Sequence, residues 1–311
     1  MKQKIPLVTI IMPVHNAGKF LVPAIESILA QTYARFELII VDDGSTDQSW
    51  KTIRAYKKRY PKTIRVYRTE KQLNSAGNGA TDVGLSHAKG EYIARMDGDD
   101  VALPKRIEKQ VQFLQDNPLV ILVGTQADII NKNGKRIGTK TVPTTNSAIY
   151  ESYGVVHPII HPSVMIRRSA LPNRDKIYLH KWGINDDYYS FFKLLTYGQF
   201  ANLPEVLLRY RIHGTNASLT NVKEKFYNTA KIRLEAMKYF NYQMSIRSLL
   251  VMATQVVLVT LLPSRFIEYI YPIVRGMDRT PQKRLRAYMA KLKKLAISHP
   301  VVRKYTVVGK L

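Results

Sequence analysis

The chain has 311 residues, and its 48 Lys and Arg against 23 Asp and Glu give a formal net charge of +25 at pH 7. A hydrophobic share of 45%, with 16 Gly and 15 Pro, is typical of a folded protein with a sizeable core and excludes a disordered or collagen-like chain. Because the chain has no cysteine, disulfide frameworks, cysteine-ligated zinc, iron–sulfur clusters and thiol nucleophiles are excluded as well.

The first 95 residues alternate segments with strand and helix patterns. Short runs rich in β-branched residues predict strands, and segments with helical spacing predict the helices between them. The predicted strands are 8–12, 37–41, 64–67 and 92–95, and the predicted helices are 20–30, 47–60 and 80–88. Such alternation folds into a parallel sheet with helices on both faces, and its ligand crevice lies at the carboxyl ends of the strands. We therefore predict an α/β fold with a mostly parallel central sheet.

The pattern changes after residue 100. The predicted elements there are a helix at 105–117, a strand at 120–125 and a hairpin at 127–140 that turns at Asn133-Gly134. Residues 153–215 have the pattern of a mixed α/β continuation, with a helix at 188–196. We therefore predict a catalytic domain at residues 1–220 and a helical, basic region at 221–311.

The region 221–311 holds 18 basic and 4 acidic residues. It begins with a predicted helix at 223–240, and an uncharged span of 17 residues follows between Arg247 and Arg265. This span is at the short edge of the roughly 17–25 residues of a transmembrane helix, so we expect an interfacial or core helix. Basic residues beside an apolar helix favour contact with an anionic membrane surface. The alternative is a solvated charged face whose apolar helix packs on the catalytic domain.

An acidic motif, Asp97-Gly98-Asp99-Asp100, follows the fourth predicted strand. Alternate residues of an extended segment point the same way, so we expect Asp97 and Asp99 to converge while Asp100 turns away. Two converging carboxylates suit Mg²⁺ or Mn²⁺, which prefer oxygen ligands and bridge to substrate phosphates. A bound diphosphate is therefore predicted. The alternative is an acidic turn that caps the following helix.

A second acidic motif begins with Asp42 and Asp43, directly after the second predicted strand. Thr46 or Asp47 is a suitable N-cap for the next helix, but the first two carboxylates precede the turn, where they can accept hydrogen bonds from a nucleobase or a ribose. The segment 16–19 lacks the glycine spacing of a P-loop or a Rossmann fingerprint. We therefore expect phosphate to be held through a metal ion.

In order and spacing, the motifs of this chain resemble those of family 2 glycosyltransferases with the GT-A fold. The matching segments are 8–16, 29–32, 36–47, 90–93 and 97–100. The resemblance covers about residues 6–215. It implies a nucleotide-sugar donor, expected to be a UDP-sugar, with Pro13 and His15 lining the nucleoside pocket and Asp43, or its neighbour Asp42, on the base.

The resemblance also assigns the metal ligands and the catalytic base. It implies Asp97 on the ribose and metal side and Asp99 on a Mn²⁺ or Mg²⁺ ion, which neutralises charge on the departing diphosphate. Inverting members need a carboxylate that deprotonates the acceptor hydroxyl. Segment 182–189 resembles the acidic pair of the family, which makes Asp187 the predicted base. The alternative is that Asp186 and Asp187 only cap the helix that follows.

Three other residues have two readings each. His213, in a segment that resembles the one closing the donor site, either approaches the metal and diphosphate or is structural, and its neighbours Arg209 and Arg211 suggest a mobile polar loop over phosphate. Trp182 is either a platform for a sugar ring or a core residue. His161 either lines the acceptor side or packs.

One position departs from the family. Many relatives carry an Arg-Asn pair at the start of the helix after the third strand, where this chain has Thr81-Asp82. The missing positive charge removes an expected phosphate contact.

We therefore predict an inverting, metal-dependent glycosyltransferase that forms a β-glycosidic bond to a hydroxyl of a saccharide or polyprenyl-linked acceptor, in bacterial surface glycan synthesis. We expect it in the cytoplasm, peripheral on the inner face of the cytoplasmic membrane. The alternatives are a non-catalytic nucleotide-binding scaffold and a sugar-phosphate nucleotidyltransferase, whose glycine-rich basic loop is absent. A specific nucleic-acid partner is not expected, because no such module is recognisable. The sugar, the acceptor and the oligomeric state stay open.

Overall fold

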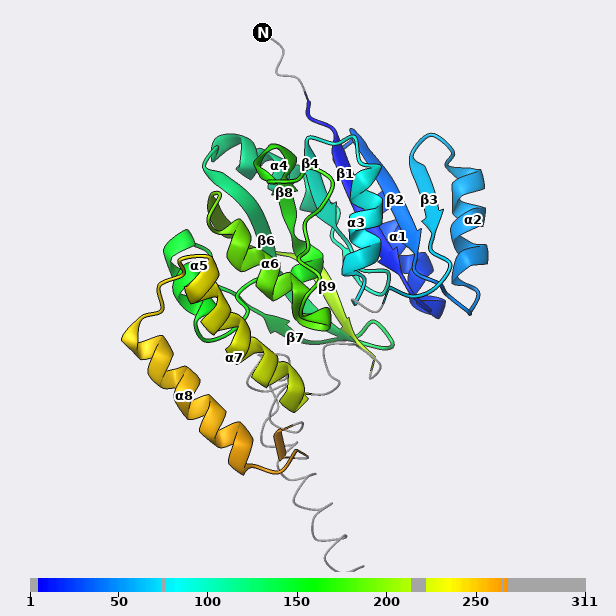
Figure 1. Cartoon of the computed structure of the whole chain (residues 1–311). Coiled ribbons are helices and arrows are strands. Elements are labelled where there is room, and N and C mark those ends of the chain that lie inside the picture. Colours follow the sequence, from blue (N-terminus) through cyan, green and yellow to red (C-terminus); the bar gives the residue numbers. More distant parts are fainter. Residues whose placement is uncertain (1–4, 74–75, 214–221, 265, 268–311) are drawn as a thin grey trace, which may run out of the picture.

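The computed structural model describes residues 5–73, 76–213, 222–264 and 266–267, which form one mixed sheet with helices on both faces (Figure 1). The strands are β1 (Val8–Val14), β2 (Phe36–Asp42), β3 (Ile64–Arg68), β4 (Tyr92–Arg95), β5 (Val101–Ala102), β6 (Val120–Asn131), β7 (Arg136–Lys140), β8 (Met165–Arg167) and β9 (Gln199–Ile212). The helices are α1 (Leu21–Leu29), α2 (Ser49–Arg59), α3 (Asn78–Ser86), α4 (Arg106–Asp116), α5 (Asn146–Tyr153), α6 (Asp186–Leu194), α7 (Val222–Tyr239) and α8 (Ile246–Leu261).

The sheet has the strand order β3-β2-β1-β4-β8-β6-β9-β5, and β7 pairs with β6. Strands β3, β2, β1 and β4 are parallel neighbours, as the alternation predicts. Strand β8 is antiparallel to both β4 and β6, so the sheet is mixed beyond β4. Strands β6 and β9 are parallel, and the short β5 lies antiparallel to β9. The α/β class is therefore confirmed, and the parallel half carries most of the predicted nucleotide-binding residues.

The predicted elements of the first 120 residues agree with the structure to within a few residues. The region after them differs, because the predicted strand at 120–125 and the first arm of the hairpin form the single strand β6. The hairpin turns where predicted, and Gly134 adopts a φ of 80° that favours glycine.

Alternating side chains of the central strands fill two hydrophobic clusters, one on each face of the sheet. In β1, Ile10 and Met12 pack with residues of α1, α2 and α4, whereas Ile11 packs with residues of α3, α5, α6 and α7. All three side chains are fully buried. Strand β1 therefore anchors both layers, because a strand covered on both faces buries successive side chains in opposite directions.

The two C-terminal helices differ in how they pack. Helix α7 places Ile232 and Ala236 in the second cluster, and α8 lies along α7 at the outside of the molecule (Figure 1). In helix α8, Ile246 is 78% and Leu261 is 76% exposed. Of the two expectations for this helix, an interfacial helix or a core helix, the core helix is therefore wrong. Within the described ranges, every helix is too short or too polar to cross a bilayer.

We expect Ile10→Ala to lower the free energy of unfolding by about 2–5 kcal/mol, because truncation leaves a cavity in the cluster beneath β1. Ile137→Ala is the matched control, since this isoleucine of β7 is 47% exposed and its truncation should change the free energy by no more than about 0.5 kcal/mol. Urea denaturation followed by circular dichroism measures both values. Equal losses for the two variants would contradict the central place of β1.

Candidate active site

A cleft of about 1000 Å³ opens at the carboxyl ends of β1, β2 and β4 and extends to α6, α7 and α8. Pro13 and His15 line it from the end of β1, Asp43 lines it after β2, and Asp97 and Asp99 of the acidic motif line it after β4. Asp187 of α6 lines the same cleft. The fold therefore brings together residues that are up to 174 positions apart in the sequence.

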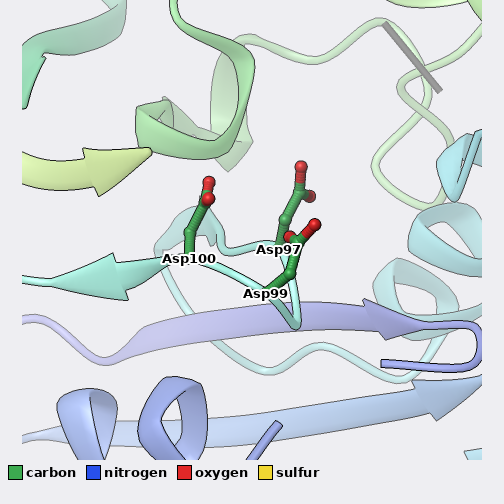
Figure 2. A group of neighbouring side chains, drawn as sticks. All are labelled: Asp97, Asp99 and Asp100. Carbon is green, nitrogen blue, oxygen red and sulfur yellow. The ribbon is translucent and has the colours of Figure 1, made fainter. Parts of the chain in front are cut away.

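The acidic motif forms a tight turn, in which the Asp100 amide donates to the Asp97 carbonyl at 3.3 Å. One carboxylate oxygen from each of Asp97, Asp99 and Asp100 lies within 4.8 Å of the others, and Figure 2 shows the three side chains on the same side of the turn. The predicted convergence of Asp97 and Asp99 is confirmed. The expectation that Asp100 turns away is wrong in part. Its carboxylate stays close to the other two, but the side chain is buried, its Oδ1 accepts from the Arg211 amide, and it does not line the cleft.

Two arginines hold this acidic turn from opposite sides. The Arg95 Nε donates to Asp97 Oδ1 at 3.0 Å. On the other side, the Arg211 amide donates to Asp100 Oδ1 at 2.8 Å and its Nε donates to the Asp99 carbonyl at 2.7 Å. Both arginine side chains are almost fully buried. The turn is therefore fixed by charged hydrogen bonds.

The carboxylates of the acidic turn still repel one another. Burial, followed by repulsion from Asp99 and Asp97, raises the pKa of Asp100 well above its ordinary value. A third buried arginine, Arg106, lies beneath the turn, where burial lowers its pKa to about 10 although the carboxylates oppose the shift. Asp100 Oδ2 is buried without a hydrogen-bond partner in the described part of the chain. An oxygen-only donor set with an orphaned carboxylate oxygen fits a divalent ion such as Mn²⁺ or Mg²⁺.

His213 reaches the acidic turn from the end of β9. Its Nε2 lies 2.9 Å from Asp99 Oδ2, and its ring packs on Phe20 at a centroid distance of 5.0 Å. The expected approach of this imidazole to the acidic turn agrees with the structure. The expectation of a mobile polar loop around His213 is wrong in part, because Arg209 and Arg211 belong to the strand β9. Residues 214–216, also expected in that loop, lie outside the described residues.

The structure separates the two neighbouring carboxylates that follow β2. Asp43 lines the cleft, and its carbonyl contacts His15 Nδ1 at 2.8 Å. Asp42 does not line the cleft, because it points to Arg68, whose Nε lies 2.9 Å from Asp42 Oδ2. Of the two predicted alternatives, the structure places Asp43 where a base could be contacted.

A positive charge lies close to Thr81-Asp82, where the chain departs from the family pattern. Arg95 Nη1 donates to Thr81 Oγ1 at 2.8 Å and to Asn78 Oδ1 at 3.1 Å, so a guanidinium from β4 lies against the start of α3. Asp82 instead binds His180 at 2.9 Å. Sequence reasoning missed Arg95, although an arginine within the apolar strand 92–96 is a signal for a buried polar partner.

The acidic pair at the start of α6 divides into a structural and a cleft-facing member. Asp186 Oδ1 accepts the amides of Lys181 at 3.0 Å and Trp182 at 2.6 Å, which closes the preceding loop. Asp187 faces the cleft. Trp182 packs edge-on against Tyr189 and does not line the cleft, so the structure places it with the core and not as a sugar platform.

Two histidines flank the Asp187 carboxylate. His157 Nε2 lies 3.3 Å and His161 Nδ1 lies 3.4 Å from the same oxygen, Oδ2, while the Tyr188 amide donates to Oδ1 at 2.8 Å. Burial by itself raises the pKa of Asp187, but the imidazoles and the amide lower it well below the usual range. His161 therefore lines the site, which was one of its two readings. Sequence reasoning gave His157 no role.

We expect Asp100→Asn to raise the melting temperature of the metal-free protein at pH 7. An acid whose pKa is raised by folding stabilises the folded state only at low pH, and this stability is lost as the pH rises through the folded pKa. Folding therefore disfavours ionisation of Asp100, a cost that Asp100→Asn removes at pH 7, and each 1 kcal/mol relieved raises the melting temperature by about 2–4 °C.

Differential scanning calorimetry in EDTA tests this expectation. Asp116→Asn is the control, because that carboxylate is exposed on α4, and it should leave the melting temperature unchanged. A lower melting temperature for Asp100→Asn would contradict an unfavourable burial of the Asp100 carboxyl group in the acidic turn.

Comparison with known proteins identifies the family of the chain. The sequence profile of Glycosyl transferase family 2 matches residues 9–174. The chain is 33% identical over 234 residues to the O-antigen biosynthesis glycosyltransferase WbnJ of Escherichia coli. This alignment covers 73% of this chain and 87% of that protein.

Solved structures share the fold. The structure of S. aureus TarS 1–349 in complex with UDP-GlcNAc aligns with a TM-score of 0.61 and 20% identity over 83% of this chain and 74% of that one. The mannosyltransferase PcManGT from Pyrobaculum calidifontis, in complex with GDP-Man and Mn²⁺, aligns with a TM-score of 0.58 and 17% identity over 97% of this chain and 83% of that one.

Proposed function

The chain belongs to glycosyl transferase family 2 and is a glycosyltransferase, and from this premise we propose that it moves a sugar from a UDP-sugar, with inversion, to a hydroxyl of a saccharide or lipid-linked saccharide. The observation that carries the proposal is the arrangement of two acidic groups in one cleft. The acidic turn at the end of β4 lies on the donor side, and the single carboxylate of Asp187 faces the cleft from α6.

The donor side of the cleft has the groups that a nucleoside diphosphate requires. We assign the nucleoside to the pocket of Pro13, His15 and Asp43, and the diphosphate to the neighbourhood of Asp97 and Asp99. A divalent ion bound by the acidic turn would neutralise charge on the departing diphosphate. Binding of UDP-GlcNAc by TarS and of GDP-Man with Mn²⁺ by PcManGT supports a nucleotide sugar and a metal as ligands of this fold.

Asp187 is placed to act as the general base. In a single displacement the acceptor oxygen forms a bond to the anomeric carbon as the bond from that carbon to the diphosphate oxygen breaks. The proton of the acceptor hydroxyl passes to Asp187, and the diphosphate leaves with the electron pair of the broken bond. The low pKa of Asp187 keeps the carboxylate ionised before the attack.

The acceptor side is more apolar than the donor side. Leu258, Leu262 and Ile267 line the end of the cleft between α7 and the C-terminal part of α8. We therefore include a lipid-linked saccharide among the acceptors, in the synthesis of a bacterial surface glycan such as the O-antigen named for the E. coli relative. A non-catalytic scaffold would keep the nucleotide pocket but would have no need of Asp187.

We further propose that the region 221–311 attaches the protein to the inner face of the cytoplasmic membrane. Four exposed apolar side chains lie on one stripe of α8, here called the α8 stripe: Ile246, Leu250, Val257 and Leu261. Together with the excess of basic residues in this region, an apolar stripe is typical of helices that bind anionic membrane surfaces. The division at residue 220 stays a prediction.

We expect Asp187→Asn to lower kcat by about 10²–10⁴-fold, the range for loss of a general base, while UDP·Mn²⁺ still binds. Asp99→Asn should instead weaken the binding of UDP·Mn²⁺. Loss of a residue that only supports a metal ligand lowers metal affinity by about 10–100-fold, and loss of a ligand should lower it at least as much. Asp175→Asn is the control, because that carboxylate is 60% exposed, pairs with Arg168 and does not line the cleft. Turnover of Asp187→Asn at the wild-type rate would refute the assignment of the base.

We expect Leu250→Ser/Leu261→Ser to reduce co-sedimentation with vesicles of phosphatidylglycerol and phosphatidylethanolamine. Each serine removes apolar area from the α8 stripe, at about 25 cal/mol per Å² of surface no longer buried in the membrane. Thr254→Ser, on the same helix, controls for changes in helix stability. Wild-type sedimentation of the double variant would show that the α8 stripe does not contact the membrane.

A further inference from the structure

Two imidazoles direct ring nitrogens at one oxygen of the proposed base. His157 Nε2 and His161 Nδ1 both face Asp187 Oδ2, at 3.3 and 3.4 Å. Both rings also pack edge-on against the ring of Phe191, with interplanar angles of 88° and 80°. Aromatic packing therefore fixes both ring planes, and the remaining question is which nitrogen of each ring carries the hydrogen.

For His157, a backbone amide answers this question. The Ile159 amide donates to His157 Nδ1 at 3.3 Å. A nitrogen that accepts a hydrogen bond has no hydrogen of its own, so the neutral ring carries its hydrogen on Nε2. That hydrogen is directed at Asp187 Oδ2, where an ionised carboxylate accepts it.

For His161, a chain of side chains gives the opposite tautomer. Arg95 Nη1 donates to Tyr178 Oη at 3.3 Å, and Tyr178 Oη lies 2.6 Å from His161 Nε2. Burial raises the pKa of Tyr178, so the phenol keeps its hydrogen and donates it to His161 Nε2. The hydrogen of the imidazole is then on Nδ1, which faces Asp187.

The charges around His161 favour the neutral ring. Burial lowers its pKa well below the ordinary value, and the nearby Arg95 guanidinium lowers it further, against the opposite effect of Asp187. Tyr178 and Asp187 contact its two nitrogens, so both polar atoms of the ring are engaged. His161 is therefore a neutral ring that donates a hydrogen bond to Asp187.

We propose that His157 and His161 are positioning residues for Asp187, a role that rests on the proposed function. Their two N–H groups hold Oδ2 while the Tyr188 amide holds Oδ1, so the carboxylate is kept ionised in one orientation toward the acceptor hydroxyl. Contacts of 3.3–3.4 Å are long for hydrogen bonds and shorten when a catalytic site binds its substrate.

The same network connects the base to the donor side. The Arg95 guanidinium that contacts Tyr178 also donates to Asp97 of the acidic turn at 3.0 Å. The chain of contacts therefore runs from Asp97 through Arg95, Tyr178 and His161 to Asp187. Through this chain the position of the base is set relative to the carboxylates that face the diphosphate.

Nuclear magnetic resonance tests the two tautomers without any substrate. In the full chain labelled with ¹⁵N-histidine, two-bond ¹H–¹⁵N spectra report which ring nitrogen carries the hydrogen, and His157→Gln and His161→Gln assign the signals. We expect an Nε2–H ring for His157 and an Nδ1–H ring for His161, both neutral near pH 7. An Nε2–H tautomer for His161, or an imidazolium at that pH, would overturn the inference.

Kinetics test the positioning role with the UDP-sugar as donor and water as acceptor. We expect His161→Asn and Tyr178→Phe each to lower kcat by about 10²-fold, as misplacement of a catalytic group does, with KM changed less than about twofold. His87→Gln is the control, because that imidazole stacks on Tyr67 at the surface. Wild-type kcat in folded His161→Asn or Tyr178→Phe would overturn the inference.

The two failures can be told apart. If the wild-type protein binds no UDP with Mn²⁺ while the tautomers are as expected, the proposed function fails and the geometry around Asp187 stands. If UDP binds with Mn²⁺ while His161 has the other tautomer, only the positioning role fails. Tyr178→Phe keeps a buried aromatic ring, so it tests the network even if His161→Asn does not fold.

Discussion

Mutual repulsion among the three carboxylates of the acidic turn is the constraint on which the rest of the cleft depends. Three carboxylates with oxygens within 4.8 Å of one another are unfavourable unless positive charge lies close by. The chain supplies it from three buried arginines in different elements, namely Arg95 in β4, Arg106 in α4 and Arg211 in β9. The carboxylates of Asp97 and Asp99, which line the cleft, are what a divalent ion would bind, and a diphosphate would bind through that ion.

The arginines also explain why the mixed half of the sheet belongs to the site. Antiparallel pairing of β5 with β9 brings Arg211 to the acidic turn. His161 comes shortly before β8, which pairs with β4, and it lines the cleft together with Asp187 of α6. The parallel strands alone would supply the acidic turn but none of these groups. The proposed catalytic arrangement therefore depends on β8 and β9 as much as on the parallel strands.

The sequence was sufficient to predict the features that depend on local pattern. Apart from the two-residue strand β5, the strands and helices of the first 120 residues follow from hydrophobic spacing. A carboxylate motif that directly follows a predicted strand can also be placed at the edge of the sheet. The choice between Asp42 and Asp43 could not be made from the sequence, because it depends on Arg68 of a different strand. The buried position of Asp100 was missed for the same reason, since the pairing of β5 with β9 is nonlocal. Polar networks such as the one from Arg95 to Tyr178, which are 83 residues apart, leave no periodic pattern in the sequence.

The most direct test of the account is a calorimetric titration of the full chain with UDP, GDP and dTDP, each with Mn²⁺ and again with EDTA. The account predicts that UDP binds in the presence of Mn²⁺ and that EDTA abolishes the binding, because the diphosphate is held at the acidic turn through the ion. Failure of all three nucleotides to bind the folded protein, or UDP binding of equal strength in EDTA, would contradict the assignment of the acidic turn as the metal–diphosphate site.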